Sequence, residues 1–397
     1  MAEWKEYTVA DVISTVIDYR GKTPKKLGGD WSDSGYRALS AKNIKTGKIV
    51  QPDSIRYVSE DMYRCWMKEE IQKEDILITS EAPFGQIYYW DSDEKIVLSQ
   101  RLFAVRINQQ FYPKYIYFYM TSSFFQTELD GRATGTTVVG LRQPELLKCK
   151  IFAPDYQEQK RIADTLWCLE QKINNNEAIN NNLEQQAQAI FENEFLSLQS
   201  LPDGWKQASL IDIADYLNGL AMQKYRPSAN EIGIPVLKIK ELRQGCCDDN
   251  SEFCSPSIKS DYIIHDGDVI FSWSGSLLVD FWCGGICGLN QHLFKVSSSN
   301  YDKWFYYAWT KHHLDRFIAV AADKATTMGH IKRDELAKAE VLIPNETDYN
   351  RIGALLQPIY DLIISNRIEN KKLAETRDSL LPKLMSGEID MSEVDYE

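Results

Sequence analysis

The sequence predicts an α+β fold: two similar mixed α/β heads, separated by two long helices that pair as an antiparallel coiled coil with pseudo-two-fold symmetry. The first observation behind this prediction is an internal repeat. Trp4-Lys5 returns as Trp205-Lys206 at an offset of 201 residues, and residues 135–154 return as residues 325–344 at an offset of 190. The offset only shrinks along the chain, as loop deletions in the second copy would produce. A repeat this long is expected to be a domain plus a connecting element.

The second observation is the mixed character of each copy. Short apolar runs bounded by Gly, Pro, Ser and Asp are typical of strands, and they occur at 75–79, 87–90, 102–107, 268–273 and 292–296. Aromatic segments typical of helices follow at 115–129 and 304–318. These patterns predict a first head over residues 1–156 and a second head over residues 198–345.

The third observation is a heptad pattern after each head, over residues 157–197 and 346–397, the second range ending in a short acidic tail. Apolar positions alternate at spacings of four and three, as in a coiled-coil seam. A helix of about 40 residues is about 60 Å long, and its apolar stripe needs a partner, which the other copy supplies. We expect antiparallel pairing, with the heads at opposite ends.

Both heptad segments interrupt the seam with two asparagines at matching positions, Asn176 and Asn180 in the first and Asn366 and Asn370 in the second. Buried asparagines can fix the register of a coiled coil through amide pairing. The alternative is that these side chains lie at a solvated edge of the helices.

Bulk composition is that of an ordinary globular protein, with 44% hydrophobic and 26% charged residues. The sequence shows no apolar stretch of about 18 residues and no export signal, so no membrane partner is expected. The eight cysteines follow no disulfide spacing, which favours a reducing, cytoplasmic location.

The net charge of −12 lies mostly in the two helical segments, whereas the heads are close to neutral. A generic electrostatic grip on DNA is therefore not predicted, and DNA binding needs local basic clusters or a partner. Two antiparallel copies nevertheless match the local two-fold axes of duplex DNA, on which two-headed readers meet two half-sites. Because the heads differ, the half-sites are expected to differ, with the helices setting their spacing.

Several motifs together resemble the specificity subunit of a type I DNA restriction–modification enzyme. They are PDGWK (202–206) with EWK (3–5), RGKTP (20–24), the paired-threonine segments near 136 and 326, and LLPKLMSGEID (380–390). The resemblance implies two target-recognition domains and no catalytic activity of this chain. It also implies double-stranded DNA, two adenine-methyltransferase subunits docked on the helices and two restriction/translocase subunits as partners. S-adenosylmethionine, ATP and Mg are then expected on those partners, and no cofactor on this chain.

The candidate DNA-binding residues are polar or basic side chains, mostly at matching places in the two copies. They are Arg20, Lys22, Lys42, Asn43, Lys45, Ser80, Gln100, Arg101, Thr136, Thr137 and Arg142, and then Lys238, Lys240, Arg243, Ser274, Gln291, His292, Thr326, Thr327 and Lys332. Gln and Arg read base edges, while Lys and hydroxyl side chains suit phosphates. The alternatives are turns leading into strands, a strand-edge cap at Gln100-Arg101, and ordinary solvated charge.

Catalytic and metal sites are not predicted. Pro154-Asp155 with Glu158 and Lys160 imitates a nuclease motif, but these residues enter a single helix rather than converging from separate strands. The cysteines lack paired zinc spacing, and no nucleotide-binding or adenine-methylation motif is present. A restriction enzyme with its own catalytic site is therefore disfavoured. A two-headed protein–protein scaffold without DNA specificity remains the alternative function.

Overall fold

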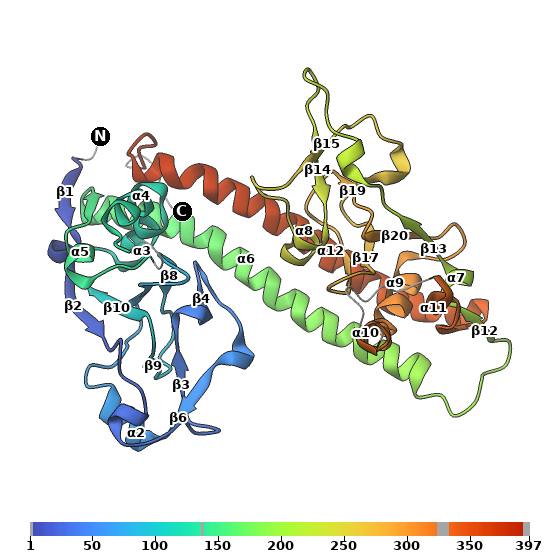
Figure 1. Cartoon of the computed structure of the whole chain (residues 1–397), viewed down its shortest axis with the longest axis horizontal. Helices are drawn as coiled ribbons and strands as arrows, with labels where there is room; N and C mark the ends of the chain where they lie inside the picture. The colour runs from blue at the N-terminus through green and yellow to red at the C-terminus, as the bar shows by residue number, and fades with distance from the viewer. Residues whose placement is uncertain (1–2, 136–138, 324–332, 392–397) are drawn as a thin grey trace. The chain divides into compact units, whose positions relative to one another are not determined.

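The computed structural model describes residues 3–135, 139–323 and 333–391 of the 397. The chain forms two compact units (Figure 1). Unit 1 contains residues 1–171 and 374–397, and unit 2 contains residues 172–373. Each unit therefore combines one head with parts of both long helices, whereas the sequence-based boundaries follow the chain segment by segment.

The two heads have the same strand order, which confirms the α+β class and the repeat. Head 1 has a four-stranded sheet ordered β2-β10-β7-β8, and head 2 has one ordered β13-β20-β17-β18. In head 1 these strands are β2 (Ile13–Asp18), β10 (Leu102–Ile107), β7 (Ile76–Thr79) and β8 (Ile87–Tyr89). In head 2 they are β13 (Asp215–Asn218), β20 (Leu293–Ser297), β17 (Val269–Ser272) and β18 (Leu278–Phe281). All the pairings are antiparallel.

A second sheet, of three strands in head 1 and four in head 2, contains a parallel pair in each head, β3 with β9 and β14 with β19. In head 1 the strands are β6 (Arg56–Val58), β3 (Tyr36–Leu39) and β9 (Val97–Leu98). In head 2 they are β15 (Phe253–Cys254), β14 (Ile234–Leu237), β19 (Cys287–Leu289) and β16 (Ile263–Ile264). A two-stranded ribbon closes each head, β1 (Lys5–Thr8) with β11 (Lys150–Ala153) and β12 (Lys206–Ser209) with β21 (Glu340–Ile343).

The helices of the heads also correspond. The pairs are α1 (Val9–Val12) and α7 (Leu210–Ile213), α3 (Pro113–Thr121) and α9 (Lys303–His312), α4 (Ser123–Arg132) and α10 (Leu314–Asp323), and α5 (Gln143–Leu147) and α11 (Arg333–Ala337). The remaining elements of head 1 are η1 (Lys25–Leu27), η2 (Ala41–Asn43), β4 (Ile44–Lys45), β5 (Lys48–Ile49), η3 (Pro52–Ser54) and α2 (Glu60–Trp66). Those of head 2 are η5 (Met222–Lys224), α8 (Ile239–Gln244) and η6 (Ser260–Tyr262).

The aromatic segments predicted at 115–129 and 304–318 each divide into two helices. In head 1 the break falls at Ser122, whose backbone is extended at φ −69° and ψ 155°. Its hydroxyl donates to the Tyr119 carbonyl, which satisfies one of the last acceptors of α3. The aromatic pattern therefore located the helical region but not this break.

The core of unit 1 joins segments from both ends of the chain. Tyr115, Phe118 and Phe125 of the head pack in one buried cluster with Ile162 and Leu166 of α6 (Tyr156–Phe191). Leu384 and Met385, at the end of α12 (Glu346–Met385), lie in the same cluster. Burial of each such side chain contributes about 1.5–3 kcal/mol. The first head is thus completed by the last turns of the second long helix.

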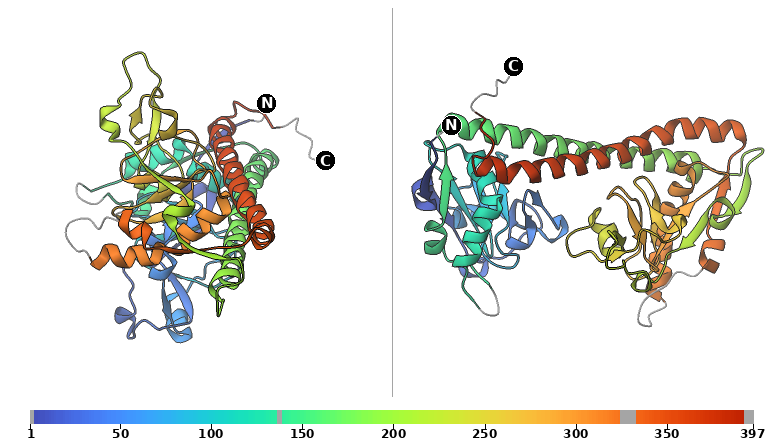
Figure 2. Two further views of the ribbon diagram at one scale, coloured as in Figure 1. Left: turned by 90° about the vertical axis from the view of Figure 1, so that its right-hand side faces the viewer. Right: turned by 90° about the horizontal axis from the view of Figure 1, so that it is seen from above.

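In unit 2, the two helices pair with opposite chain directions (Figure 2). Glu184 of α6 bonds Arg367 of α12 at 2.8 Å, while Glu194, in the π-helical turn Glu192–Leu196 that follows α6, bonds Arg351 at 2.6 Å. Higher numbers on one helix therefore meet lower numbers on the other. Seam positions such as Ile173, Ala187, Ile352, Leu356 and Ile363 are buried. The predicted antiparallel pairing is confirmed within this unit.

The four seam asparagines form two amide pairs across the helices of unit 2. Asn176 Nδ2 donates to Asn370 Oδ1 at 2.8 Å, and Asn366 Nδ2 donates to Asn180 Oδ1 at 2.9 Å. Asn180 and Asn366 are only 5% and 8% exposed. These side chains therefore lie inside the seam, in the position that a register role requires. The register role itself stays a prediction.

Replacing Asn180 alone with leucine is expected to destabilise unit 2 by about 1–3 kcal/mol, because the buried amide of Asn366 loses its acceptor. Adding Asn366→Leu is expected to recover most of that loss, since no polar group of the pair is then left unsatisfied. A double-mutant cycle measured by urea unfolding checks the coupling. Strictly additive losses would contradict the pairing.

His313 gives unit 2 a predicted pH dependence. Burial lowers the pKa of this imidazole to about 4, and its Nε2 lies 2.8 Å from the Glu340 carbonyl oxygen. Because the pKa in the folded state lies below the unfolded value of about 6.5, the unfolded state takes up the proton first. Stability is expected to be complete above pH 6.5 and to fall by at most about 3 kcal/mol toward pH 4. Thermal unfolding against pH, with His313→Gln as the control that flattens the profile, measures this effect.

Candidate nucleic-acid interface

Several of the predicted residues of head 1 line three adjoining recesses in unit 1. The first recess has a volume of about 270 Å³ and is lined by Trp31, Ala38, Ser40, Ala41, Lys42, Ser54, Arg56, Ala82, Ser99, Gln100 and Arg101. The second, of about 750 Å³, shares Gln100 and Arg101 and adds Arg20 and Ser80. The third, of about 570 Å³, shares Arg20 with the second and adds Arg142. Residues far apart in the sequence are thus brought to one surface.

Gln100 and Arg101 form the tight connection between β9 and β10, and both side chains are exposed. Arg101 has a left-handed backbone at φ 62°, an uncommon conformation for a non-glycine residue. Its Nε lies 3.1 Å from a carboxylate oxygen of Glu81. The turn therefore presents an amide and a guanidinium at the boundary of two recesses, which suits contact with a base edge or a phosphate.

Arg20 and Lys22 are largely occupied by contacts within the protein. The Arg20 guanidinium bonds Asp18 at 2.6 Å and the Leu141 carbonyl at 3.0 Å, and it lies over the Phe103 ring. Lys22 Nζ donates to the Trp66 carbonyl at 3.0 Å. These contacts hold loops in place. A structural role for Arg20 and Lys22 is therefore an alternative to the predicted contact with DNA.

Asn43 and Ser80 are fully buried. Asn43 accepts from the Ser40 hydroxyl at 2.8 Å and donates to the Ser54 hydroxyl at 2.9 Å, so its amide supports the wall of the first recess. The Ser80 hydroxyl has no hydrogen-bond partner among the described residues. Lys45 is exposed on β4 and lies outside the lining of these recesses.

In head 2, the candidate side chains more often have a partner within the protein. Lys238 Nζ lies 2.6 Å from Glu252, and Lys240 Nζ lies 2.8 Å from Asp248. The Ser274 hydroxyl lies 3.1 Å from His292 Nδ1. Gln291 Nε2 lies 3.3 Å from the other ring nitrogen of the same histidine. The predicted residues of the β19–β20 turn and of the loop after β17 are therefore brought together.

Other predicted residues are placed separately or not at all. Arg243 is exposed in the last turn of α8. Thr136, Thr137, Thr326, Thr327 and Lys332 lie outside the described residues. Within the described ranges, no cluster of three or more His, Cys, Asp or Glu side chains could hold a metal ion.

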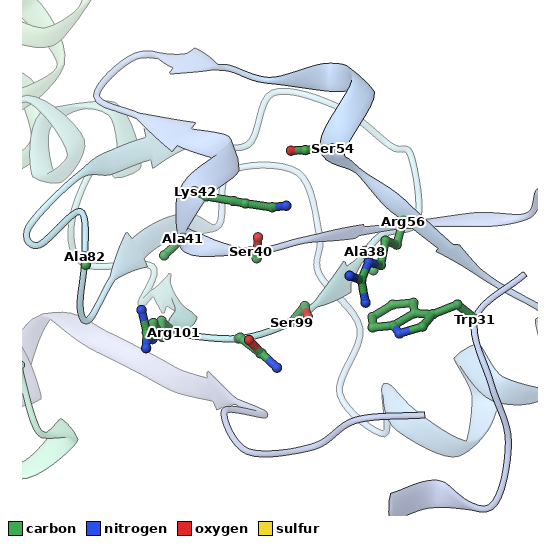
Figure 3. A pocket seen from close by; sticks show the side chains of 11 residues that line it. Trp31, Ala38, Ser40, Ala41, Lys42, Ser54, Arg56, Ala82, Ser99 and Arg101 are labelled. Carbon is green, nitrogen blue, oxygen red and sulfur yellow. The ribbon is translucent and has the colours of Figure 1, made fainter. Parts of the chain in front are cut away.

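Sequence reasoning missed Arg56 and Trp31, which both line the first recess. The Arg56 guanidinium lies 5.1 Å from the centre of the Trp31 ring, and Figure 3 shows the two side chains adjacent with Lys42 extended across the same recess. No motif marks either residue. The signal lies in the strand register, which sets Arg56 opposite Ala38.

The two heads share the strand order of their four-stranded sheets and carry polar side chains at the same turn, with different partners in each head. The family model of the type I restriction modification DNA specificity domain matches residues 1–185 and again residues 202–375. The chain belongs to this family, which confirms the resemblance seen in the sequence.

Proteins similar to this chain match it over nearly its whole length. The chain is 26% identical to the type I restriction enzyme MjaIX specificity subunit of Methanocaldococcus jannaschii, with 94% of this chain and 87% of the relative covered. It is 23% identical to the EcoKI specificity subunit of Escherichia coli, with 96% and 89% covered. A crystal structure of the S subunit from M. genitalium has the same fold, with a TM-score of 0.59 at 15% identity and 96% of both chains covered.

Proposed function

We propose that this chain is the non-catalytic specificity subunit of a type I restriction–modification enzyme and that it reads an asymmetric bipartite site in double-stranded DNA. The observation that carries the proposal is the repetition of one head topology with different side chains at matching turns, Gln100-Arg101 in head 1 and Gln291-His292 in head 2. Two heads with the same strand order but different side chains at the matching turns suit two half-sites of different sequence.

Assembly is the second part of the proposal. The two long helices dock two adenine-methyltransferase subunits, and two restriction/translocase subunits join for cleavage. S-adenosylmethionine, ATP and Mg are bound by those partners. A cytoplasmic location fits this role. Within the described residues no helix is long and apolar enough to cross a membrane, and none of the eight cysteines forms a disulfide.

The proposed function is tested by selection from a random duplex library in a gel-shift experiment, first with the chain alone and then with its methylating partner. Enrichment of one motif with two unlike halves and a fixed spacer is expected. Failure to enrich a bipartite motif in either condition would favour the alternative, a two-headed protein–protein scaffold without DNA specificity.

The acidic helices carry a testable prediction about assembly. Glu192 and Asp361 are exposed acidic residues on the helical part of unit 2. Replacing both with lysine is expected to weaken binding of the methylating subunits by on the order of tenfold, because complementary surface charge steers association. Analytical ultracentrifugation at low and high salt measures the effect.

The matched control for this charge reversal places the same two changes on the heads, at Asp53 and Asp261, which are also exposed. The control is expected to assemble normally. Equal behaviour of the helix variant and the head variant would contradict docking on the acidic helices.

A further inference from the structure

We propose that Lys42 and Arg56 clamp one phosphate of the DNA backbone in the first recess, and that head 2 has no equivalent clamp. This inference rests on the proposed function and deepens it. It assigns a role to Arg56 and Trp31, and it predicts that the two heads grip their half-sites by different means.

The first recess has the composition of an anion site. Lys42, Arg56 and Arg101 contribute to its lining, which contains no Asp or Glu among the described residues. Ser40, Ser54 and Ser99 add hydroxyl groups to the same lining. Basic and hydroxyl side chains around one recess are the usual partners of phosphate oxygens.

Arg56 is held ready for such a ligand. Its guanidinium is placed over the Trp31 ring, 5.1 Å from the ring centre, which orients the planar group while its N–H donors stay available. Within the described ranges, neither Arg56 nor Lys42 has an ion-pair partner, whereas Arg101 is paired with Glu81 at 3.1 Å. Two neighbouring unpaired cations repel each other unless an anion lies between them. The phosphodiester is the anion that a duplex supplies at every nucleotide.

Head 2 fills the corresponding place with its own ion pairs. Ile234 pairs with Cys254, as Tyr36 pairs with Val58 in head 1. Glu252, the residue just before β15, continues this register: its carbonyl accepts from the Val236 N–H at 2.7 Å, so it takes the place that Arg56 has in head 1.

That carboxylate is already bound. Glu252 lies 2.6 Å from Lys238, the counterpart of Ser40, and 3.3 Å from Arg226. These cations hold the pKa of Glu252 below its usual value, with the hydrogen bond from Lys238 as the main cause. Head 2 therefore has a carboxylate, Glu252, at the position where head 1 has the unpaired guanidinium of Arg56. This position in head 2 cannot bind a phosphate in the same way.

The inference is tested in the full chain assembled with its methylating subunits, on a duplex that carries the selected site. Binding is measured at several salt concentrations between roughly 50 and 300 mM. Each lost phosphate contact is expected to reduce the slope of log K against log salt by about 0.9 and to weaken binding about eightfold at 0.1 M salt. Arg56→Ala and Lys42→Ala are each expected to show this loss, with equal losses on every duplex sequence.

Two further variants sharpen the test. Arg56→Lys is expected to keep most of the slope, because a phosphate accepts a point charge, whereas a guanine edge needs the arginine fork. Arg64→Ala is the matched control, since Arg64 is an exposed arginine of the same unit that is paired with Glu60 outside the recess. Arg64→Ala should leave the slope unchanged.

The outcomes are distinguishable. If the unmodified complex enriches no bipartite site, the proposed function fails. If the unmodified complex binds its site but Arg56→Ala and Lys42→Ala leave the slope unchanged, the phosphate clamp alone is overturned. If Arg56→Ala instead relaxes the base preference of one half-site at an unchanged slope, Arg56 reads a base and the clamp is likewise overturned.

Discussion

Adding one heptad to both long helices is expected to abolish methylation of the original DNA site and to direct it to the same two half-sites at a longer spacing. Seven residues lengthen a helix by about 10 Å, and the heptad keeps the seam in phase. The insertion points are after Gln171 in α6 and after Leu373 in α12, where the two compact units divide. The heads themselves are unchanged, so the bases that they read are expected to stay the same.

The effect on the original site is expected to be large. A half-site out of register loses several base contacts worth about 1–3 kcal/mol each, so methylation at the old spacing should fall by on the order of 100-fold or more. Sequencing of methylated adenines measures it. A control chain receives the same heptad as a replacement rather than an addition, and it should keep the old spacing. If the lengthened chain kept the old spacing, the claim that the length of the helices sets the distance between the half-sites would be contradicted.

Replacing Arg367 with alanine is expected to destabilise unit 2 by about 3 kcal/mol. Arg367 of α12 bonds Asp280 of β18 at 2.6 Å and Glu184 of α6 at 2.8 Å. It therefore connects the head to both helices within this unit. Its side chain is only 27% exposed, and its removal leaves two partly buried carboxylates without their shared cation.

Urea unfolding of the full chain measures this loss. Arg351→Ala is the matched control, because Arg351 lies on the same helix, pairs with Glu194 at 2.6 Å and is 50% exposed. Exposed pairs contribute about 0.2–1 kcal/mol, so the control should lose far less stability. Equal losses from the two variants would show that Arg367 does not connect β18, α6 and α12 within unit 2 as described.

The frame of the protein could be predicted from sequence because its signals are periodic or repeated. Heptad spacing marks every buried seam position on a long helix, and Ile173 and Ile363 illustrate it in unit 2. Because the repeat is collinear, the two heads were expected to share one strand order, and both four-stranded sheets follow the same order. The prediction of one helical segment over 115–129 was wrong in a local feature, because one extended residue, Ser122, divides that segment into two helices.

The candidate site was less predictable because its chemistry depends on partners across strands. In the sequence, nothing distinguishes Lys238 from Lys42. In the structure, Lys238 forms an ion pair with Glu252, which lies 14 residues further along the chain, whereas no described residue pairs with Lys42. Asn43 has the composition of a DNA contact, yet it is buried in a capping arrangement with Ser40. Arg56 carries no motif and becomes visible only when β6 is paired with β3.

The central claim is that this chain gives a methylating enzyme its bipartite DNA specificity. The most direct test is genome-wide sequencing of methylated adenines in the host, with and without the gene for this chain. We predict that one motif, with two unlike halves and a fixed spacer, is methylated only when the chain is present. Identical methylation patterns in the two strains, or a lost motif that is continuous or palindromic, would contradict the claim.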